Sequence, residues 1–345
     1  SYLITLSLTD GTATVTKDLT INILNLNDVA PEFTSAATFS IDENTTAVGT
    51  AAATDVEGDD VTFTISGSEL SITSAGVITF NSAPDYETKT SHTATITASD
   101  GVNTTDQSIT VNINNLNDNN PVFTTSSTLN GDENQTSIST VAASDADGDS
   151  VSFTISGSDL AISSDGVLTF VTEPDYEQVT SFTATITATD GTLSTDQSVT
   201  VNVNNLNDNA PVYTAATGVN ASENQTSAFT VTGTDADGDT LTYAISGGAD
   251  KDSFTINSSS GVVIFNTAPD YETKTTYVIV VDILDGGYTT SQEVTINITD
   301  VNEAPLISSS ASFNADENQT AIGTASASDP EGTEISYSVT GTDAS

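Results

Sequence analysis

The feature of this 345-residue chain that most limits its fold is a unit of about 90 residues that repeats along its length. A segment rich in Asn and Asp closes with proline at positions 31, 121, 211 and 305, at intervals of 90, 90 and 94 residues. "IDENTT", "GDENQT", "ASENQT" and "ADENQT" follow these prolines in turn, and "PDYE" recurs at 84, 174 and 269. Because whole units repeat, we expect one fold to serve for all of them.

Each unit shows the alternation of apolar and polar residues that is typical of half-buried strands. In the first complete unit the alternating segments are 61–65, 76–80, 93–98 and 109–113, separated by Gly, Asp and Asn turns. No segment has the period of 3.6 residues that marks a helix. About seven short strands in about 90 residues predict an all-β protein of tandem Greek-key, immunoglobulin-like β-sandwiches, which we expect to follow one another in a linear rod.

The repeat boundaries predict three whole modules and two fragments. The whole modules are residues 30–119, 120–209 and 210–303, residues 1–29 are the end of a module with its linker, and residues 304–345 are the beginning of another. We interpret the chain as a window cut from a longer array. Two alternatives remain, namely that the fragments close into one module, or that the end of one chain completes the start of the next in a filament.

The charge of the chain limits its partners. There are 48 acidic residues against four Lys and no Arg, and the formal net charge is −44. Nucleic acid and anionic membranes should therefore be repelled. The chain has no cysteine, so neither disulfides nor thiolate metal sites are available. It also has no apolar run of the length that inserts into a membrane, and its first residues do not resemble a signal peptide.

The acidic residues gather around the linkers between modules. Seven carboxylates within about a nanometre would repel one another, by roughly 4 kcal/mol for a pair 4 Å apart at an effective dielectric of 20. The set predicted at the junction 115–121 is Glu43, Asp85, Glu87, Asn115, Asn117, Asp118, Asp145, Asp147 and Asp190. The set at the next junction is Glu133, Asp175, Glu177, Asn205, Asn207, Asp208, Asp235, Asp237 and Asp285.

The two outer junctions carry altered sets. The last consists of Glu223, Asp270, Glu272, Asp300, Asn302, Glu303, Asp329 and Glu331, and the first of Asp28, Asp55, Glu57 and Asp100. The four sets hold 25 of the 48 acidic residues, which argues against a merely solvated charge pattern. Hard divalent cations would offset the repulsion, and Ca²⁺ fits best because it accepts six to eight oxygen ligands in adaptable geometry. Two or three Ca²⁺ per complete junction would nearly balance seven negative charges.

These motifs resemble those of tandem cadherin repeats, of the kind found in bacterial surface proteins and adhesins, and the resemblance covers essentially the whole chain. It implies calcium between successive modules. The ligands would be the Glu of "DEN", the Asp and Glu of "PDYE", the Asn/Asp linker, and the "DxD" and "TDG" acids of the next module. By that likeness Glu43, Asp85 and Glu87 would bridge ions.

The chain departs from the family pattern at several positions. The family usually begins the linker with Asp, whereas Asn25, Asn115 and Asn205 stand there and only Asp300 agrees. A neutral amide should weaken that ligand. The first junction lacks its upstream motifs, and at the last junction Glu303 replaces the linker Asp and no downstream "TDG" follows.

Other readings of these motifs are weaker. "DADGD" does not fit an EF-hand, because Gly148 stands at the fourth position and Ser156 where the bidentate Glu belongs. A glycosidase-like acid pair in "PDYE" would have to be repeated in every module. His92 has no Ser or Cys nucleophile in register, and we expect it to be a surface or strand residue with its bonds satisfied. The "PDYE" tyrosines are expected to pack inward.

We therefore predict a calcium-stiffened extracellular spacer or stalk in a cell-surface adhesin or surface filament, and not an enzyme. Its partners would be calcium ions, neighbouring repeats and, in a filament or cell contact, like chains. The alternative is a directly adhesive module that binds a ligand or its own kind. Secretion is implied because extracellular calcium modules commonly bind in the range of about 10⁻⁴ to 10⁻³ M.

Overall fold

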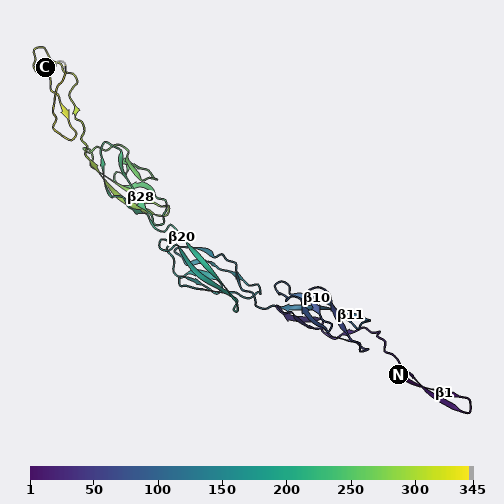
Figure 1. The fold of residues 1–345 in the computed structure, drawn as a ribbon. Coiled ribbons are helices and arrows are strands. Elements are labelled where there is room, and N and C mark those ends of the chain that lie inside the picture. The colour runs from purple at the N-terminus through teal and green to yellow at the C-terminus, as the bar shows by residue number, and fades with distance from the viewer. Residues whose placement is uncertain (342–345) are drawn as a thin grey trace. The chain divides into compact units, whose positions relative to one another are not determined.

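A computed structural model describes residues 1–341 of the chain and confirms the all-β prediction (Figure 1). Apart from one 3₁₀ turn, η1 (Lys251–Ser253), the regular elements in this range are strands. No helix among the described residues is long and apolar enough to span a membrane. The last four positions of the predicted fragment 304–345 lie outside the described residues.

The first whole repeat consists of a four-stranded sheet, a three-stranded sheet and a short pair of strands. Their orders are β4-β11-β10-β7, β5-β9-β8 and β3-β6. The strands are β3 (Glu32–Phe33), β4 (Thr38–Asp42), β5 (Ala47–Thr50), β6 (Ala53–Thr54), β7 (Thr62–Ile65), β8 (Leu70–Ile72), β9 (Val77–Phe80), β10 (Ser91–Ser99) and β11 (Thr104–Asn114).

The next two repeats follow the same strand order. The second contains β12 (Val122–Phe123), β13 (Thr128–Asp132), β14 (Ser137–Thr140), β15 (Ala143–Ser144), β16 (Ser152–Ile155), β17 (Leu160–Ile162), β18 (Val167–Phe170), β19 (Ser181–Thr189) and β20 (Ser194–Asn204). The third contains β21 (Val212–Tyr213), β22 (Gly218–Ser222), β23 (Ser227–Thr230), β24 (Gly233–Thr234), β25 (Thr242–Gly247), β26 (Phe254–Ile256), β27 (Val262–Phe265), β28 (Thr276–Leu284) and β29 (Thr289–Thr299).

The core of each whole repeat lies between its sheets, as alternating strands require. In the first repeat one hydrophobic cluster joins Ile78 of the smaller sheet to Ile96 and Val111 of the larger sheet. The third repeat has the equivalent cluster, with Val263 facing Ile279 and other fully buried residues. Because both sheets contribute to one cluster, the first and third repeats are β-sandwiches, and the second has the same strand order.

Strand pairing in the larger sheet decides where the chain leaves the repeat. β4 runs parallel to β11, in a register that places Asp42 opposite Asn114 at the end of both strands. The next residue, Glu43, therefore comes to lie where the linker begins. The third repeat has the same register between β22 and β29.

The ends of the chain form smaller pieces. β1 (Tyr2–Thr9) and β2 (Thr14–Ile21) make an antiparallel hairpin whose residues are all exposed. β30 (Leu306–Ile307) and β31 (Ala327–Ser328) form a short antiparallel pair. These pieces have the strands expected of an end and a beginning of a repeat, and the predicted module boundaries stay a prediction.

Backbone contacts group the chain into two compact units. One comprises residues 1–129, 138–171 and 183–200, and includes the first repeat. The other comprises residues 130–137, 172–182 and those from 201 onward, and includes the third. Each junction between repeats that is described below lies within one of these units.

Candidate metal centres between repeats

The Glu of "DEN" binds the linker to the end of its own repeat. Glu43 is only 1% exposed, and its carboxylate accepts the backbone N–H groups of Tyr86 and Leu116, both at 2.8 Å. Glu133 accepts those of Tyr176 and Leu206 at 2.7 and 2.6 Å. Glu223 makes the corresponding bonds to Tyr271 and Val301, both at 2.7 Å. A buried carboxylate with both oxygens bonded holds the "PDYE" loop and the linker together.

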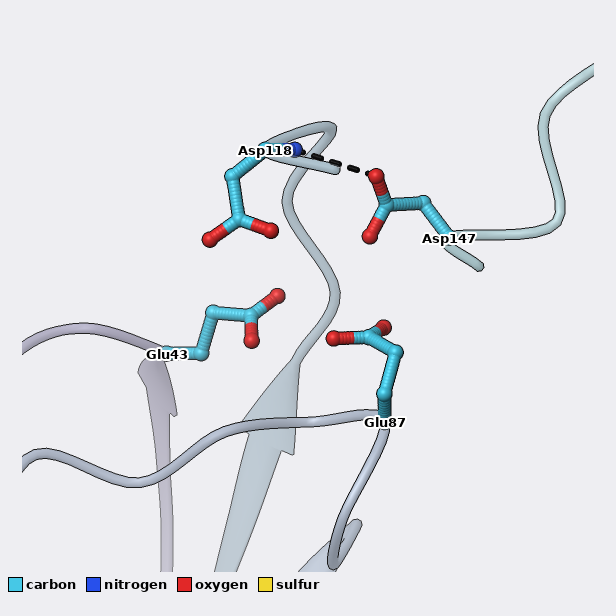
Figure 2. Close-up of side chains that lie close together, drawn as sticks. All are labelled: Glu43, Glu87, Asp118 and Asp147. Carbon is cyan, nitrogen blue, oxygen red and sulfur yellow. Dashed lines mark hydrogen bonds between the residues drawn. The ribbon is translucent and has the colours of Figure 1, made fainter. Parts of the chain in front are cut away.

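Four predicted ligands meet at the junction 115–121. Oxygen atoms of Glu43, Glu87, Asp118 and Asp147 all lie within 4.8 Å of one another, and Figure 2 shows the four side chains pointing toward a common point. They come from one repeat, the linker and the next repeat. Asp85 lines a pocket of about 180 Å³ together with three of them. The chain therefore brings together four of the seven acids that the sequence predicts here, with Asp85 beside them.

The charges at this junction act on one another. Burial, followed by the negative charges of Glu43, Asp147 and Asp85, raises the pKa of Glu87. Burial acts in the same direction on Asp147, but hydrogen bonds from Asn119 outweigh it and lower the pKa of Asp147. Glu177 and Glu272, the equivalents of Glu87, also have raised pKa values, with burial as the largest cause.

Asp145 and Asp190 of the downstream repeat lie in turns whose backbone N–H groups bind only one oxygen of each carboxylate. Asp145 Oδ1 accepts the N–H of Asp147 at 3.0 Å, and Asp190 Oδ1 accepts those of Thr192 and Leu193 at 2.6 and 2.7 Å. The other oxygen, Oδ2, is buried without a hydrogen-bond partner in both residues. Such an oxygen is costly to bury unless a cation faces it.

The second junction repeats this arrangement. Glu133, Glu177 and Asp208 have oxygens within 4.8 Å of one another, and Asp237 Oδ2 accepts the N–H of Asp208 at 3.1 Å. Asp235 and Asp285 each bury an unpartnered Oδ2. Asp175 lies in the adjoining loop, where Gln178 Nε2 donates to it at 2.6 Å.

The last junction is assembled differently. Glu223, Glu272 and Asp300 meet within 4.8 Å. Glu303 donates its N–H to Glu331 Oε1 at 2.7 Å, and both of these glutamates bury an unpartnered Oε2. Three further predicted residues bond locally, namely Asp270 with Thr273, Asn302 with Glu303, and Asp329 with Thr333.

The first junction has only its downstream half. Asp55, Glu57 and Asp59 offer oxygens within 4.8 Å of one another, and Asp55 buries an unpartnered Oδ2. Burial, followed by a hydrogen bond with Asp28, raises the pKa of Glu57. Asp100 lies in the turn between β10 and β11, where its Oδ1 accepts the N–H groups of Val102 and Asn103, both at 2.7 Å.

The unpartnered atoms provide a test of whether these residues fit calcium. Among the described residues, twelve buried side-chain nitrogen or oxygen atoms lack a hydrogen-bond partner. Eight belong to predicted ligands: Asp55, Asn117, Asp145, Asp190, Asp235, Asp285, Glu303 and Glu331. Carboxylate and amide oxygens are the ligands that Ca²⁺ takes. The donor set therefore fits calcium, and the ligand assignments themselves stay predictions.

Several site residues were not among the predicted ligands. Asn44 adopts a left-handed backbone (φ 62°), which Asn tolerates better than most residues, and its Nδ2 donates to Asp118 Oδ2. Asn134 and Asn224 do the same for Asp208 and Glu303. The signal was in the sequence, because an Asn follows every Glu of this motif. Asn119 and Asn209 in the linkers were also overlooked.

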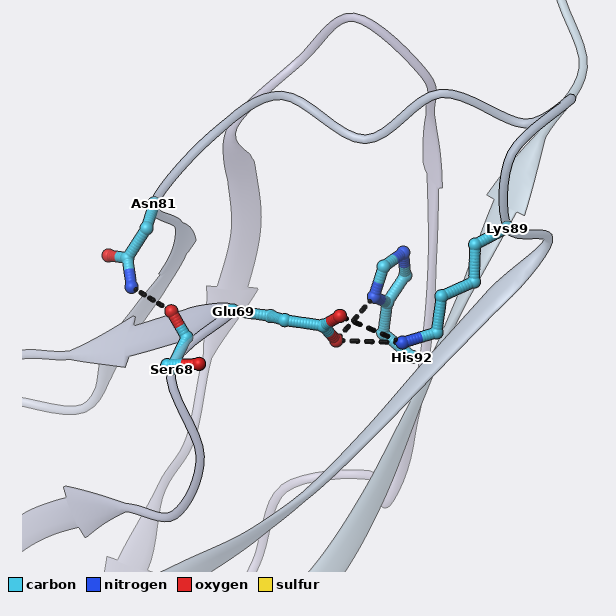
Figure 3. A network of polar contacts seen from close by, with 5 residues as sticks. All are labelled: Ser68, Glu69, Asn81, Lys89 and His92. Carbon is cyan, nitrogen blue, oxygen red and sulfur yellow. Dashed lines mark hydrogen bonds and ion pairs between the residues drawn. The ribbon is translucent and has the colours of Figure 1, made fainter.

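His92 and the motif tyrosines lie within single repeats. His92 is 7% exposed in β10, its Nδ1 lies 2.9 Å from Glu69 Oε2, and its ring packs edge-on against Phe80 at 4.7 Å. Figure 3 shows Lys89 reaching the same Glu69 carboxylate, at 2.8 Å. His92 is thus a strand residue, as predicted, although its Nε2 is buried without a partner. Tyr86 packs against the core of its repeat, also as predicted.

Comparisons with known proteins agree with this architecture. Residues 218–299 match the cadherin domain family model. The chain is 30% identical over 370 residues to mouse cadherin EGF LAG seven-pass G-type receptor 2, which covers 94% of this chain and 13% of the relative. It is 32% identical over 232 residues to the protocadherin-like wing polarity protein stan of Drosophila melanogaster, covering 59% of this chain and 6% of that protein.

Solved structures show the same fold. Extracellular cadherin domains 3–6 of protocadherin gamma B2 match with a TM-score of 0.66 and 24% identity, over 87% of this chain and 84% of theirs. The protocadherin gammaB4 extracellular domain matches with a TM-score of 0.57 and 23% identity, over 95% of this chain and 61% of that one.

These comparisons do not support the expected bacterial type of protein, but they support the expected cadherin-like repeats. The two curated relatives named above are animal proteins, so the predicted likeness to a bacterial-type surface protein is not supported. The chain spans about an eighth or less of their length. The recurring strand order, the repeated junction motifs and the cadherin-domain match identify the chain as a tandem array of cadherin-like β-sandwich repeats.

Proposed function

We propose that this chain is an extracellular spacer segment of a cell-surface protein, made stiff by calcium bound where successive repeats meet. A short linker between sandwiches with a modest interface would otherwise keep some freedom to bend. Oxygen ligands drawn from both neighbours remove that freedom, because one ion then fixes two repeats at once. The array would thereby hold whatever lies at its two ends a defined distance apart.

The residues of one repeat, the linker and the next repeat would share each site. At the junction 115–121, Glu43, Asp85 and Glu87 supply the upstream carboxylates, and Asn117 and Asp118 supply the linker ligands. Asp145, Asp147 and Asp190 complete the site from the downstream repeat. Bound calcium would supply positive charge to seven carboxylates, and two or three ions approach neutrality.

One observation supports this proposal above the others. Buried, unpartnered oxygens recur at equivalent positions, on Asp145 and Asp190 at one junction and on Asp235 and Asp285 at the next. Each turn holds one oxygen of its Asp with backbone N–H groups and leaves the other buried without a hydrogen-bond partner. A carboxylate that served only to close the turn would not need that second oxygen buried.

An extracellular location follows from the affinity expected of such sites. Extracellular calcium modules bind in the range of about 10⁻⁴ to 10⁻³ M, so a cytosolic chain would leave them empty. The solved structures that resemble this chain are described as extracellular domains. The proposed role is mechanical, and no catalytic step is assigned to the acids.

Calcium titration of an Asp147→Ala variant tests the proposal. Asp147 touches the linker and lies in the four-carboxylate cluster. Its loss should weaken binding at the junction 115–121 by about tenfold or more and leave the junction 205–211 unchanged. Asp165→Ala is the matched control, since Asp165 carries the same charge in the turn between β17 and β18. A parent chain that binds no calcium, or an Asp147 variant that binds like its parent, would refute the proposal.

A further inference from the structure

The linker asparagines make bonds across the junction that need no ion. Asn115 Nδ2 donates to the backbone carbonyl of Asp147 at 2.7 Å. Asn119 Nδ2 donates to Asp147 Oδ1 at 2.9 Å, and the backbone N–H groups of Asp118 and Asn119 donate to Asp147 Oδ2 at 3.1 and 2.9 Å. The linker thus holds both carboxylate oxygens and the carbonyl of one downstream residue.

The next junction makes the same four bonds. Asn205 Nδ2 donates to the carbonyl of Asp237 at 2.7 Å, and Asn209 Nδ2 donates to its Oδ1 at 2.9 Å. The N–H groups of Asp208 and Asn209 reach Asp237 Oδ2 at 3.1 and 2.9 Å. Recurrence of all four bonds at a second site shows that the sequence of the linker, rather than one local accident, specifies them.

The outer junctions differ at these two linker positions. At the first, Val29 replaces the second Asn, and two longer bonds remain, from Asn25 Nδ2 at 3.2 Å and from the Val29 N–H at 3.3 Å, both to Glu57. At the last, Asp300 replaces the first Asn and Ala304 the second, and Asp300 joins the acidic cluster with Glu223 and Glu272. An Asp at this position has no amide hydrogen to donate, so it can act only as an acceptor or a ligand.

We propose that the two linker asparagines, present together or not, decide between two kinds of junction. Asn115 and Asn205, with Asn119 and Asn209, form a direct latch on Asp147 and Asp237, which keeps these two junctions ordered without calcium. Asp300 instead contributes a ligand, and Ala304 has no side-chain amide. The last junction therefore keeps the Glu303 N–H bond to Glu331 but not the asparagine bonds, and it depends more strongly on calcium for its order. This inference rests on the proposed function, since it sets how strongly calcium changes each junction, but its central test is made in chelator.

The amide geometry explains why both asparagines are needed. Asn119 is half-buried and also donates to Asp118 Oδ1 at 2.8 Å, so its amide joins a linker carboxylate to a downstream carboxylate. A neutral donor between two like charges lowers their repulsion without adding charge. Asn115 binds Asp147 at a second point, the backbone carbonyl. Two separate points of attachment resist rotation of the downstream repeat about the Asn119 contact with the carboxylate.

Distance measurements between spin labels test the latch in the full chain. The chain has no native cysteine, so Ser108→Cys and Thr154→Cys place single labels on exposed strand positions on the two sides of the junction. In chelator, Asn115→Asp and Asn119→Val should each widen the distance distribution about twofold relative to the labelled parent. Asn120→Asp is the matched control, because it adds the same charge five residues farther along the linker, where none of the four bonds is made.

The widths of the distance distributions in chelator show whether the latch exists. A narrow parent distribution, widened by the two latch variants and not by the control, supports the latch. A parent that is already broad in chelator, or latch variants as narrow as the parent, overturns it. Saturating calcium should narrow every variant, which shows that the repeats are folded. A chain that binds no calcium would refute the proposed function and leave the chelator result standing.

Discussion

At the scale of single residues, two glutamates of one acidic cluster differ in the groups that their carboxylates contact. Glu43 is buried and binds two backbone N–H groups of its own repeat. Glu87 is exposed, lies in the same cluster and has a raised pKa because of partial desolvation of its carboxyl group and the neighbouring negative charges. The first is expected to serve the fold as well as the ion, and the second the ion alone.

Replacement of each glutamate with glutamine separates these roles. Glu43→Gln puts an amide group against the N–H of Tyr86 or Leu116, so one buried donor loses its acceptor and stability in chelator should fall by about 1–3 kcal/mol. Glu87→Gln removes one like charge and should leave stability in chelator equal or higher. Both variants should bind calcium less tightly. Urea unfolding in chelator provides the measurement, and a Glu43→Gln variant as stable as the parent would contradict the structural role.

Glu69 gives the first repeat a dependence on pH. Hydrogen bonds from Lys89 and then His92 lower the pKa of Glu69 to about 2. A lowered folded-state pKa means that the stabilisation is complete above the ordinary value near 4.5 and is lost as the pH falls toward about 2. In chelator, the midpoint difference between the parent and Glu69→Gln should therefore be full at pH 6 and shrink below pH 4. A midpoint difference between the parent and Glu69→Gln that grows as the pH falls would contradict a lowered pKa of Glu69 in the folded state.

At the scale of strands and turns, parallel pairing places the acids. β4 and β11 end in register, so Glu43 arrives beside the first residue of the linker. The turn between β10 and β11 carries Asp100 at the start of β11, and the linker follows the end of β11. A repeat therefore has carboxylates near both ends of its longest strand, and two repeats in tandem bring unlike sets together.

A glycine in a strand connection shows how tightly the sheets pack. Gly76 has φ 88°, and a Cβ there would lie 2.2 Å from the carbonyl oxygen of Ala51. Gly67 has nearly the same φ, 89°, but nothing lies within 4 Å of its Cβ position. Gly76→Ala should cost roughly 2–4 kcal/mol, and Gly67→Ala only about 1 kcal/mol from the left-handed backbone. Thermal unfolding of the two variants checks this, and equal losses would mean that the contact relaxes at little cost.

At the scale of the whole molecule, charge determines how the chain responds to its surroundings. A net charge of −44 with four lysines makes repulsion between repeats strong wherever cations are absent. Salt screens this repulsion over about 8 to 10 Å, whereas ions held by ligands from two repeats also fix their geometry. Calcium and sodium at matched ionic strength should therefore have different effects.

Small-angle X-ray scattering at constant ionic strength measures that difference. In millimolar calcium the curve should fit a single stiff particle. In chelator it should fit an ensemble of shapes that bend chiefly at the outer junctions, where the asparagine latch is incomplete, with a smaller mean dimension. Calcium should also raise the thermal midpoint by mass action, because it binds the folded junctions. Superimposable curves in the two buffers would remove stiffening from the proposed function.

The local pattern of the sequence was sufficient for the fold and for several of the acids that meet at a junction. Alternation in segments such as 93–98 and 109–113 fixes which side chains enter the core, because successive residues of a strand face opposite ways. The 90-residue period then predicts that one sandwich recurs, and the acidic motifs around each linker predict the residues that would meet there. The meeting of Glu43, Glu87, Asp118 and Asp147 agrees with that prediction.

Only the tertiary structure decided what individual polar atoms do. The family resemblance gave Asn115 as a weakened ligand, whereas its amide donates to the Asp147 carbonyl. Neither the resemblance nor the sequence spacing gave a role to Asn44 or Asn119. Neither of them distinguished the bonded oxygen of Asp145 from the unpartnered one. The physical reason is range: strand alternation is set by neighbours in sequence, but a hydrogen bond forms only with whatever group the fold brings within about 3 Å.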